Sequence, residues 1–490
     1  MNELESTDAD ARIMGVDESV IERGCRDQIA RLASHEAFDG PIRIMPDTHR
    51  GKGSVIGFTM PLGERVVPNV IGVDIGCGMH AANLGTDLAL EGETVDEAIR
   101  ARIPMGFGPD GLQAPEREYY HVKDEFPFER TNETLERFIE DADGGYVPEM
   151  RAFLEEGGYD IDYFERLCTE RAGQMSSYFG LTVAINSIGT LGSGNHFIEL
   201  GRSVETGAYW VVVHSGSRGL GANTCAYWQA KASTLRDGRI ERAREHLARY
   251  PEYLAFDLES TSDGDLLEWL QGGKGRDFVD YDALKADYLE TDPSQIERIS
   301  DDLKAAVPDP ESASGEDDLA YLEGAEAAGY LIDMIFCQRY AAENRAMMVR
   351  AVADVLEAEP TDTISATHNF VDFRDHVIRK GATRAYEGER VVVPFNMRDG
   401  ILVCEGKSNP EWNYSVAHGA GRLMSRTRAR SAFDADDVRA ALLAEGIHSS
   451  VVPVDEAPGA YKDSALIEDA IAETAEVVDR LEVVHNLKAA

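Results

Sequence analysis

The segment Val70–His80 reads VIGVDIGCGMH, an apolar run that ends in a turn with a carboxylate, Asp74, and a thiol, Cys77, three residues apart. Gly76 and Gly78 flank the thiol and permit a tight turn, because glycine adopts backbone conformations that other residues avoid. This spacing lets the carboxylate and the thiol face one point, as metal ligands do. The alternative is a buried strand end with a structural cysteine.

Four further turn-like segments each carry one histidine. GSGNHFIE holds His196, VVVHSGSRG holds His214, THNF holds His368 and AHGAGR holds His418. A single histidine is more often a core or loop residue than a ligand, but several in special turns favour a metal centre gathered from distant segments. Asp74, Cys77 and three imidazoles are too many donors for one tetrahedral ion, so two ions that share the thiolate fit the count. The donors alone suit Zn²⁺, and Mn²⁺ less obviously, because thiolate is a soft ligand.

His418 differs from the other histidines because it has small neighbours on both sides and arginines downstream. A histidine open to close approach and near cationic groups can attack a phosphate and form a phosphoramidate. A further metal ligand or a simple anion binder are the alternatives. The turn after His214, SGSRG, presents backbone N–H groups, hydroxyls and Arg218, which would suit an oxyanion.

The composition indicates a globular chain outside the membrane. Of the 490 residues, 43% are hydrophobic, and no run of 18 apolar residues exists, so a transmembrane helix is not expected. The first residues, MNELESTDADAR, are acidic and polar, unlike a signal peptide, so we expect a cytoplasmic location. The six cysteines are scattered without a CxxC pair, which favours metal-binding or buried roles over disulfides.

The net charge of −41, from 89 acidic and 48 basic residues, is spread along the chain. Such a surface repels nucleic acid at low salt, but it resembles proteins of a salt-loaded, halophilic cytoplasm, where the Debye length falls to roughly 3 Å at 1 M. Three stretches without Asp or Glu, 171–198, 206–236 and 412–433, carry His196, His214 and His418. The third is also rich in arginine, which indicates an anionic ligand or an ordinary basic helix face. Its arginines are Arg422, Arg426, Arg428 and Arg430.

The hydrophobic patterns predict both strands and helices. A buried strand over 209–214 delivers His214 at its end, and 66–73, 390–394 and 401–405 also read as strands. Helices are expected over 224–250, 318–358 and 465–481. The strongly acidic residues 255–318 read as a solvated, partly helical insertion.

Taken together, these segments resemble the RtcB-type RNA ligase family. The resemblance spans roughly residues 40–488, except for insertions near 107–150 and 255–316, so one catalytic domain over 1–490 is expected. It implies an α+β fold with a central active-site cleft and β-strands surrounded by helices. The matching segments are MPDTHRGKG, VIGVDIGCGM, GSGNHFIEL, VVVHSGSRGLG, HNF, KGATRA, HGAGRLMSR and APGAYKD.

The resemblance implies two Mn²⁺ ions and GTP. Asp74, Cys77 and His196 match the ligands of one ion. Cys77, His214 and His368 match those of the second, with Cys77 bridging the two.

The resemblance also assigns the nucleotide site. His418 matches the histidine that becomes guanylylated, and Asp47 an acidic residue needed at the metal side of the site. One departure affects the guanine contacts: residues 393–400 read VPFNMRDG, so Asn396 stands where a serine is expected. The residues expected to contact the nucleotide are Asn195, Glu199, Arg218, Asn396, Gly419, Ala420, Gly421 and Lys488.

The family's reaction would join an RNA 3′-phosphate or 2′,3′-cyclic phosphate end to a 5′-hydroxyl end through the guanylylated histidine. The substrates would be tRNA halves or broken RNA under repair, with a possible activator protein of the archease type. Two alternatives stay open. One is a dinuclear metal phosphoesterase that acts on RNA cyclic phosphates, and the other is a non-catalytic protein that binds RNA ends.

Overall fold

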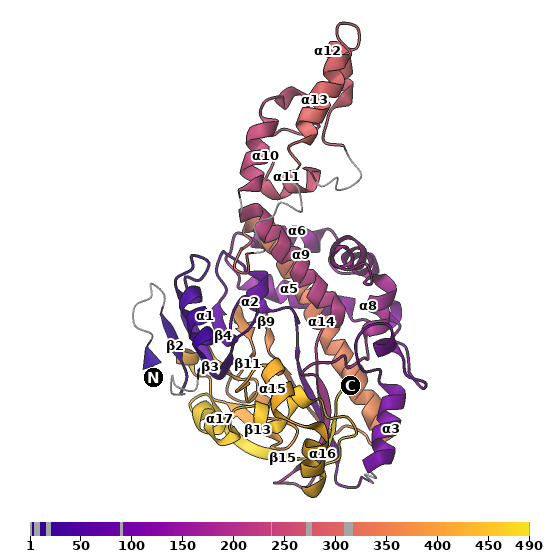
Figure 1. Ribbon diagram of the computed structural model, residues 1–490, viewed down its shortest axis with the longest axis vertical. Helices are drawn as coiled ribbons and strands as arrows, with labels where there is room; N and C mark the ends of the chain where they lie inside the picture. Colours follow the sequence, from indigo (N-terminus) through magenta and orange to yellow (C-terminus); the bar gives the residue numbers. More distant parts are fainter. Residues whose placement is uncertain are drawn as a thin grey trace.

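The protein has an α+β fold, as expected, in which helices surround two large sheets (Figure 1). The computed structural model describes residues 2–3, 10–15, 21–88, 92–236, 238–270, 277–307 and 317–489. Residues 271–276 and 308–316 of the acidic segment therefore lie outside the described residues. Within the described residues, no helix is long and apolar enough to cross a membrane.

The larger sheet has seven strands in the order β12-β13-β15-β6-β7-β5-β8, and every neighbouring pair is antiparallel. The expected strand over 209–214 is its β7, and the expected pair over 390–394 and 401–405 is β12 and β13. The strands are β5 (Gly78–Gly85), β6 (Phe197–Ser203), β7 (Tyr209–Ser215), β8 (Asp362–Thr367), β12 (Arg390–Pro394), β13 (Ile401–Gly406) and β15 (Ala475–Leu487).

The second sheet has six strands in the order β1-β2-β3-β4-β10-β9, and β11 pairs with β14 beside it. These strands carry two site segments: Asp47 lies in β3, and His418 follows the last residue of β14. The strands are β1 (Asn2–Glu3), β2 (Ala11–Ile13), β3 (Ile42–His49), β4 (Ile56–Pro61), β9 (Asn369–Val371), β10 (Val377–Lys380), β11 (Ala382–Arg384) and β14 (Ser415–Ala417).

Two long helices cross the body, α9 (Arg218–Arg236) and the largely buried α14 (Gly324–Val355). Asn344 and Arg345 of α14 are fully buried and bind loop carbonyls, since Arg345 donates to Gly76 and Ser215 (2.7 and 2.9 Å). The other helices of the body are α1 (Arg23–Ala33), α2 (Pro68–Ile71), α3 (Gly92–Arg102), α4 (Val122–Glu125), α5 (Phe128–Glu140), α6 (Val147–Glu155), α7 (Ile161–Arg166), α8 (Leu181–Ser187), α15 (Arg426–Ala432), α16 (Ala435–Ala444) and α17 (Ser464–Ile471).

A helical arm projects from the body beyond α9 (Figure 1). It contains α10 (Arg239–Leu247), α11 (Asp263–Leu270), α12 (Tyr281–Tyr288) and α13 (Ser294–Lys304). These helices share a hydrophobic core of their own, in which Leu247, Leu266, Leu284 and Leu303 are fully buried.

Three sequence predictions were wrong in detail. The expected helix over 465–481 is α17 followed by β15, because valines fill this segment and β15 pairs on both sides with β13 and β6. The expected strand over 66–73 contains the short helix α2, which begins at Pro68, a residue suited to the first helical turn. The expected helix over 224–250 is divided between α9 and α10.

Candidate active site

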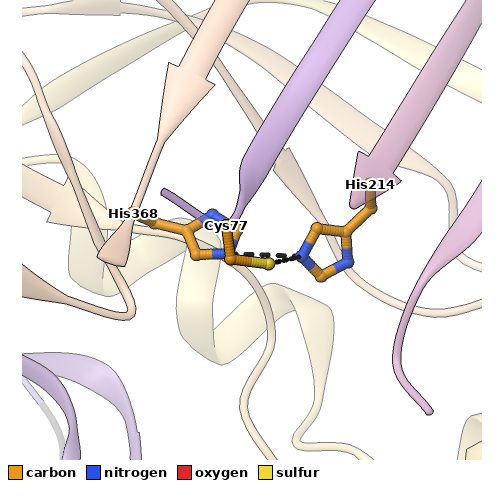
Figure 2. A group of neighbouring side chains, drawn as sticks. All are labelled: Cys77, His214 and His368. Carbon is orange, nitrogen blue, oxygen red and sulfur yellow. Dashed lines mark hydrogen bonds between the residues drawn. The ribbon is translucent and has the colours of Figure 1, made fainter. Parts of the chain in front are cut away.

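Cys77, His214 and His368 lie together in the body of the protein, and the thiol lies beside the two facing imidazoles (Figure 2). Cys77 Sγ is 3.3 Å from His214 Nε2, and His214 Nε2 is 3.2 Å from His368 Nε2. All three side chains are buried. They therefore form a compact group of donors to which three distant segments contribute.

A second group of donors shares the same thiol. His196 Nε2 is 2.9 Å from Asp74 Oδ2 and 3.6 Å from Cys77 Sγ. Within each of the two groups the donor atoms lie within 4.8 Å of one another. The five side chains, here called the pocket cluster, thus make two overlapping sets that meet at Cys77.

The antiparallel order of the larger sheet brings these donors to one edge. Cys77 directly precedes β5 and His196 precedes β6, whereas His214 lies at the end of β7 and His368 follows β8. Since neighbouring strands run in opposite directions, the starts of two strands meet the ends of the other two. The backbone tightens this arrangement, because the His368 N–H donates to the Cys77 carbonyl (2.8 Å).

Hydrogen bonds from two rings turn the free imidazole nitrogens toward the thiol. The Nδ1–H of His196 donates to the Leu191 carbonyl (2.9 Å), and the Nδ1–H of His214 donates to the Asn195 carbonyl (3.2 Å). A ring that donates from Nδ1 presents an unprotonated Nε2, which is the form that binds a metal. Gly216 is required beside this group, because a Cβ there would lie 2.1 Å from Asp74 Oδ1.

The protonation of the pocket cluster suits cation binding. Burial lowers the pKa of His214 and of His368 well below the usual value, so both rings are neutral at pH 7. Burial opposes the ionisation of Asp74, but the neighbouring His196 side chain and the Arg218 charge outweigh it and hold its pKa at about 2. Burial and the charge of Asp74 raise the pKa of the Cys77 thiol, an effect that a bound cation would reverse.

Unpaired atoms also fit the expected ions. Asp74 Oδ1 and His368 Nδ1 are buried and have no hydrogen-bond partner among the described residues. Carboxylate, imidazole and thiol are all ligands of divalent transition metals. The residues present therefore fit two cations that share Cys77.

His418 lies next to the pocket cluster and is held by Asp47. Its ring centroid is 4.6 Å from that of His368, and its Nδ1–H donates to Asp47 Oδ2 at 2.6 Å. Asp47 is fully buried, and the hydrogen bond leaves Nε2 of His418 as the free, basic nitrogen. Gly421 closes over this pair with a φ of 70°, and a Cβ there would lie 2.0 Å from the Asp47 carbonyl oxygen.

A cavity of about 210 Å³, here called the pocket, opens beside these groups. Three predicted site residues do not line it: Asp47 and His196 lie behind His418 and Asp74, and Arg218 lies behind His196, with Nη1 3.2 Å from Nδ1. The predicted site residues that line it are Asp74, Cys77, Asn195, Glu199, His214, His368, Asn396, His418, Gly419, Ala420, Gly421 and Lys488.

Glu199, in β6, is a buried acid that lines the pocket. Its Oε2 accepts from Asn486 Nδ2 (2.7 Å), and its Oε1 has no partner among the described residues. Burial raises the pKa of Glu199 to about 8, although Asn486 and Lys488 oppose the shift. The carboxyl is therefore protonated at neutral pH when the pocket holds no ligand.

Asn396, the departure from the family pattern, stabilises its own turn. Its Oδ1 accepts from the N–H groups of Arg398 and Asp399 (2.9 and 3.0 Å), and its Nδ2 donates to Asp399 Oδ2 (2.8 Å). The side chain lines the pocket while these hydrogen bonds hold it. Arg398 and Asp399 thus form one hydrogen-bonded turn with Asn396.

The acid-free arginine stretch meets acids from elsewhere in the chain. Arg422 Nη1 is 3.2 Å from Glu456 Oε1, Arg426 also pairs with Glu456, and Lys488 Nζ is 3.3 Å from Glu456 Oε2. Asp455 pairs with two of the arginines. Four cations thus meet two carboxylates, so the cluster keeps a positive excess. The stretch is free of acids along the sequence, but the fold brings Asp455 and Glu456 next to it.

Sequence reasoning missed several residues that line the pocket. Glu456 and Asn486 have no local motif, and their hydrogen bonds to Lys488 and Glu199 exist only in the folded chain. Tyr461, which donates to Glu456, lies in the matching segment APGAYKD, and that segment was the one available signal.

Comparison with known proteins identifies the family. The chain matches the family described as tRNA-splicing ligase RtcB over residues 28–255 and 286–489. RNA-splicing ligase RtcB of Escherichia coli (strain K12) is 27% identical over 94% of this chain and 92% of the relative. tRNA-splicing ligase RtcB of Archaeoglobus fulgidus is 25% identical, over 92% of this chain and 88% of the relative. Because the family match covers most of its length, the chain belongs to the RtcB family.

Proposed function

We propose that the protein is an RNA ligase that joins an RNA 3′-phosphate or 2′,3′-cyclic phosphate end to a 5′-hydroxyl end, with GTP as co-substrate. Membership of the RtcB family supports the RNA ligase activity. The observation that carries the finer proposal is the Asp47–His418 hydrogen bond beside the pocket cluster. It gives the pocket an oriented nucleophile next to cation ligands.

His418 is the covalent carrier in this proposal. Its Nε2 attacks the α-phosphorus of GTP, so that a P–N bond forms and the bond to pyrophosphate breaks. The RNA 3′-phosphate then takes the guanylate from His418, and the P–N bond breaks. A cyclic phosphate is first opened by water to a 3′-phosphate. Finally the 5′-hydroxyl attacks the activated 3′-phosphorus and GMP leaves, which completes the phosphodiester.

Asp47 positions His418 for this attack. Its carboxylate accepts the Nδ1 proton, which fixes the tautomer whose Nε2 lone pair is free. The negative charge of Asp47 also stabilises the ring as it becomes cationic on forming the P–N bond.

The pocket cluster would hold two Mn²⁺ ions. Asp74, Cys77 and His196 would bind one, and Cys77, His214 and His368 the other. Bound there, the ions would neutralise phosphate charge and orient the attacking group. The guanylate would lie against Asn195, Glu199, Asn396, Gly419, Ala420, Gly421 and Lys488, with Arg218 supporting His196 from behind.

The test is labelling with GTP that carries ³²P in its α-phosphate, in the presence of Mn²⁺. A label on the protein that is labile in acid and stable in alkali identifies a phosphoramidate. His418→Ala should abolish the label while metal content stays unchanged, and it should still join RNA that carries a pre-formed 3′ guanylate cap. A variant that still becomes labelled would show that another residue is the nucleophile.

The two alternatives predict different products. A metal phosphoesterase would open cyclic phosphates without GTP and would not need the Asp47–His418 pair. An RNA-end binding protein would retain RNA without changing it. Ligated product that depends on GTP and on His418 excludes both.

We further propose that the whole chain acts as one catalytic domain with insertions near 107–150 and 255–316. Its RNAs would be tRNA halves or broken RNA in a salt-rich cytoplasm, where screening reduces the repulsion by the acidic surface. We also propose that an activator protein of the archease type assists this ligase. Ligation that persists toward molar KCl, measured with and without such a partner, would support these points.

A further inference from the structure

A second group of metal-binding side chains lies outside the pocket. Asp96 of α3, His448 in the loop after α16 and His485 of β15 bring their donor atoms within 4.8 Å of one another. Asp96 and His485 are only 2% and 1% exposed, and His448 is half-buried. These three residues, here called the α3–β15 cluster, do not line the pocket.

The cluster contains polar atoms that the protein itself leaves unsatisfied. Asp96 Oδ2, His448 Nε2 and the ring nitrogens of His485 are buried without a hydrogen bond of regular geometry among the described residues, although the His485 ring lies against the Gly92 backbone. The two rings are also close, with centroids 4.5 Å apart. Buried polar atoms are nearly always paired, so several unpaired ones at a single place indicate a missing ligand.

Neighbouring residues orient the Asp96 carboxylate. Its Oδ1 accepts from Arg100 Nε (2.6 Å) and from Ser450 Oγ (2.8 Å), which leaves Oδ2 for a ligand. Arg100 brings a positive charge close to the cluster, but its Nη1 donates to the Lys488 carbonyl (3.0 Å), away from the histidines. Such hydrogen bonds to a ligating carboxylate are typical of metal sites.

The cluster is placed where three elements must be held together. The His448 N–H donates to the Val484 carbonyl and the Asn486 N–H donates to the His448 carbonyl, both at 3.0 Å. The loop therefore pairs with β15 on either side of His485. Successive residues of a strand face opposite ways, so His485 faces α3 while Asn486 contributes to the pocket.

We propose that Asp96, His448 and His485 bind a structural divalent transition-metal ion, of which Zn²⁺ is the best match, and that this ion fastens β15 to α3. Two imidazoles and one carboxylate are zinc ligands, and water can reach the remaining position through the half-exposed His448. The ion would hold β15 so that Asn486 and Lys488 keep their places in the pocket. This site is separate from the proposed RNA ligase chemistry, because none of its three residues lines the pocket.

The decisive variant is Asp96→Asn. The amide oxygen can still accept from Arg100 and Ser450, but the amide nitrogen cannot bind a metal, so the fold is kept and a ligand is lost. His448→Ala is the second variant, because its half-buried position tolerates truncation. His121→Ala, which removes an exposed histidine outside both clusters, is the control.

The full-length proteins are stripped with a chelator, dialysed against Zn²⁺ without nucleotide or RNA, and assayed for zinc per chain and for Tm. Asp96→Asn and His448→Ala should each hold one zinc fewer than the His121→Ala control and lose part of the zinc-dependent rise in Tm. Equal zinc content and equal Tm shifts in all three variants would overturn the proposal.

Cobalt distinguishes this site from the pocket. Co²⁺ bound to the Cys77 thiolate gives a sulfur-to-metal charge-transfer absorption, which the thiolate-free α3–β15 cluster lacks. That absorption should be the same in Asp96→Asn as in the control, whatever the fate of the RNA ligase proposal. If the lost metal took the absorption with it, the ion would belong to the pocket and the proposal would be wrong.

Discussion

The pocket cluster and the α3–β15 cluster use similar histidines in different surroundings. The first lies at an open sheet edge beside a cavity and includes a thiol, whereas the second is enclosed between α3, a loop and β15. A cavity that admits a substrate is what catalysis needs, whereas the proposed supporting ion needs only a water in its remaining position. Access for a substrate, more than the type of donor, distinguishes the two clusters.

Strand β15 connects the two clusters. Asn486 and Lys488 reach the pocket, and His485 reaches the α3–β15 cluster. Leu487 packs with Val95 and Ile99 of α3 in a shared hydrophobic core. Changes on the pocket side should therefore affect chemistry, and changes on the α3 side should affect stability first.

The largest expected effect comes from Cys77→Ala. Loss of the shared ligand should disturb both pocket ions. The rate of ligation should fall ~10³-fold or more, because the activation free energy rises by several kcal/mol. The zinc of the α3–β15 cluster should remain. Asp74→Ala should mainly weaken one ion, and Cys404→Ala, which removes a buried thiol from a separate core, is the control. A single pocket ion that is indifferent to Cys77→Ala would contradict the two-ion arrangement.

Asp47→Asn should have the next largest effect. The amide keeps the size of the side chain but loses the charge that stabilises the His418 ring, so guanylylation should slow by about 10²-fold or more. Metal content should be unchanged, because Asp47 belongs to neither donor group. Loss of metal before loss of labelling would instead make Asp47 a ligand.

Glu199 of β6 binds Asn486 on the pocket side of β15. Glu199→Gln tests this contact through the pH dependence of stability. The pKa of Glu199 is about 8 in the folded protein and ordinarily 4.5, so the folded state binds an extra proton between these values. The stability of the wild type should therefore fall, relative to Glu199→Gln, as pH rises from about 4.5 to about 8, and then level off. A relative loss on the order of 5 kcal/mol is expected over the whole range, at about 1.4 kcal/mol for each pH unit.

The measurement is denaturant unfolding of both proteins from pH 5 to pH 9, without metal or nucleotide and at constant salt. Two parallel stability curves would show that Glu199 ionises normally in the folded chain.

His448→Ala should have the smallest effect on catalysis. Loosened β15 should raise the KM for GTP by up to about 10-fold, the usual range for positioning residues around a metal, with little change in kcat. The Tm should fall by a few degrees. Steady-state ligation with varied GTP checks this, and a kcat loss as large as that of Cys77→Ala would remove the distinction between the two clusters.

The sequence predicted the donors of the pocket far better than their surroundings. Asp74, Cys77, His196, His214 and His418 stand in local turns whose glycines are visible along the chain, His368 stands in the segment THNF, and the structure brings all six together. Glu456 and Asn486 carry no such signal, since their partners Lys488 and Glu199 meet them only through tertiary pairing.

The α3–β15 cluster could not be predicted from the sequence either, because its residues also meet only through tertiary pairing. Asp96 and His485 are far apart in the chain and have no glycine turn. In addition, the expected helix over 465–481 concealed the start of β15, whose strand form depends on pairing with β13 and β6. Long-range pairing overrides local pattern most strongly in a central strand.

The central position of β15 has a consequence for how the protein is made. Without it, the larger sheet divides into the β12-β13 pair and the β6-β7-β5-β8 group. Asn486 pairs with Glu199 across almost three hundred residues, so a ribosome must release the chain through residue 487 before the sheet can close. Until then β6 presents an unpaired edge, which is open to wrong partners. The pocket is therefore among the last parts of the molecule to form.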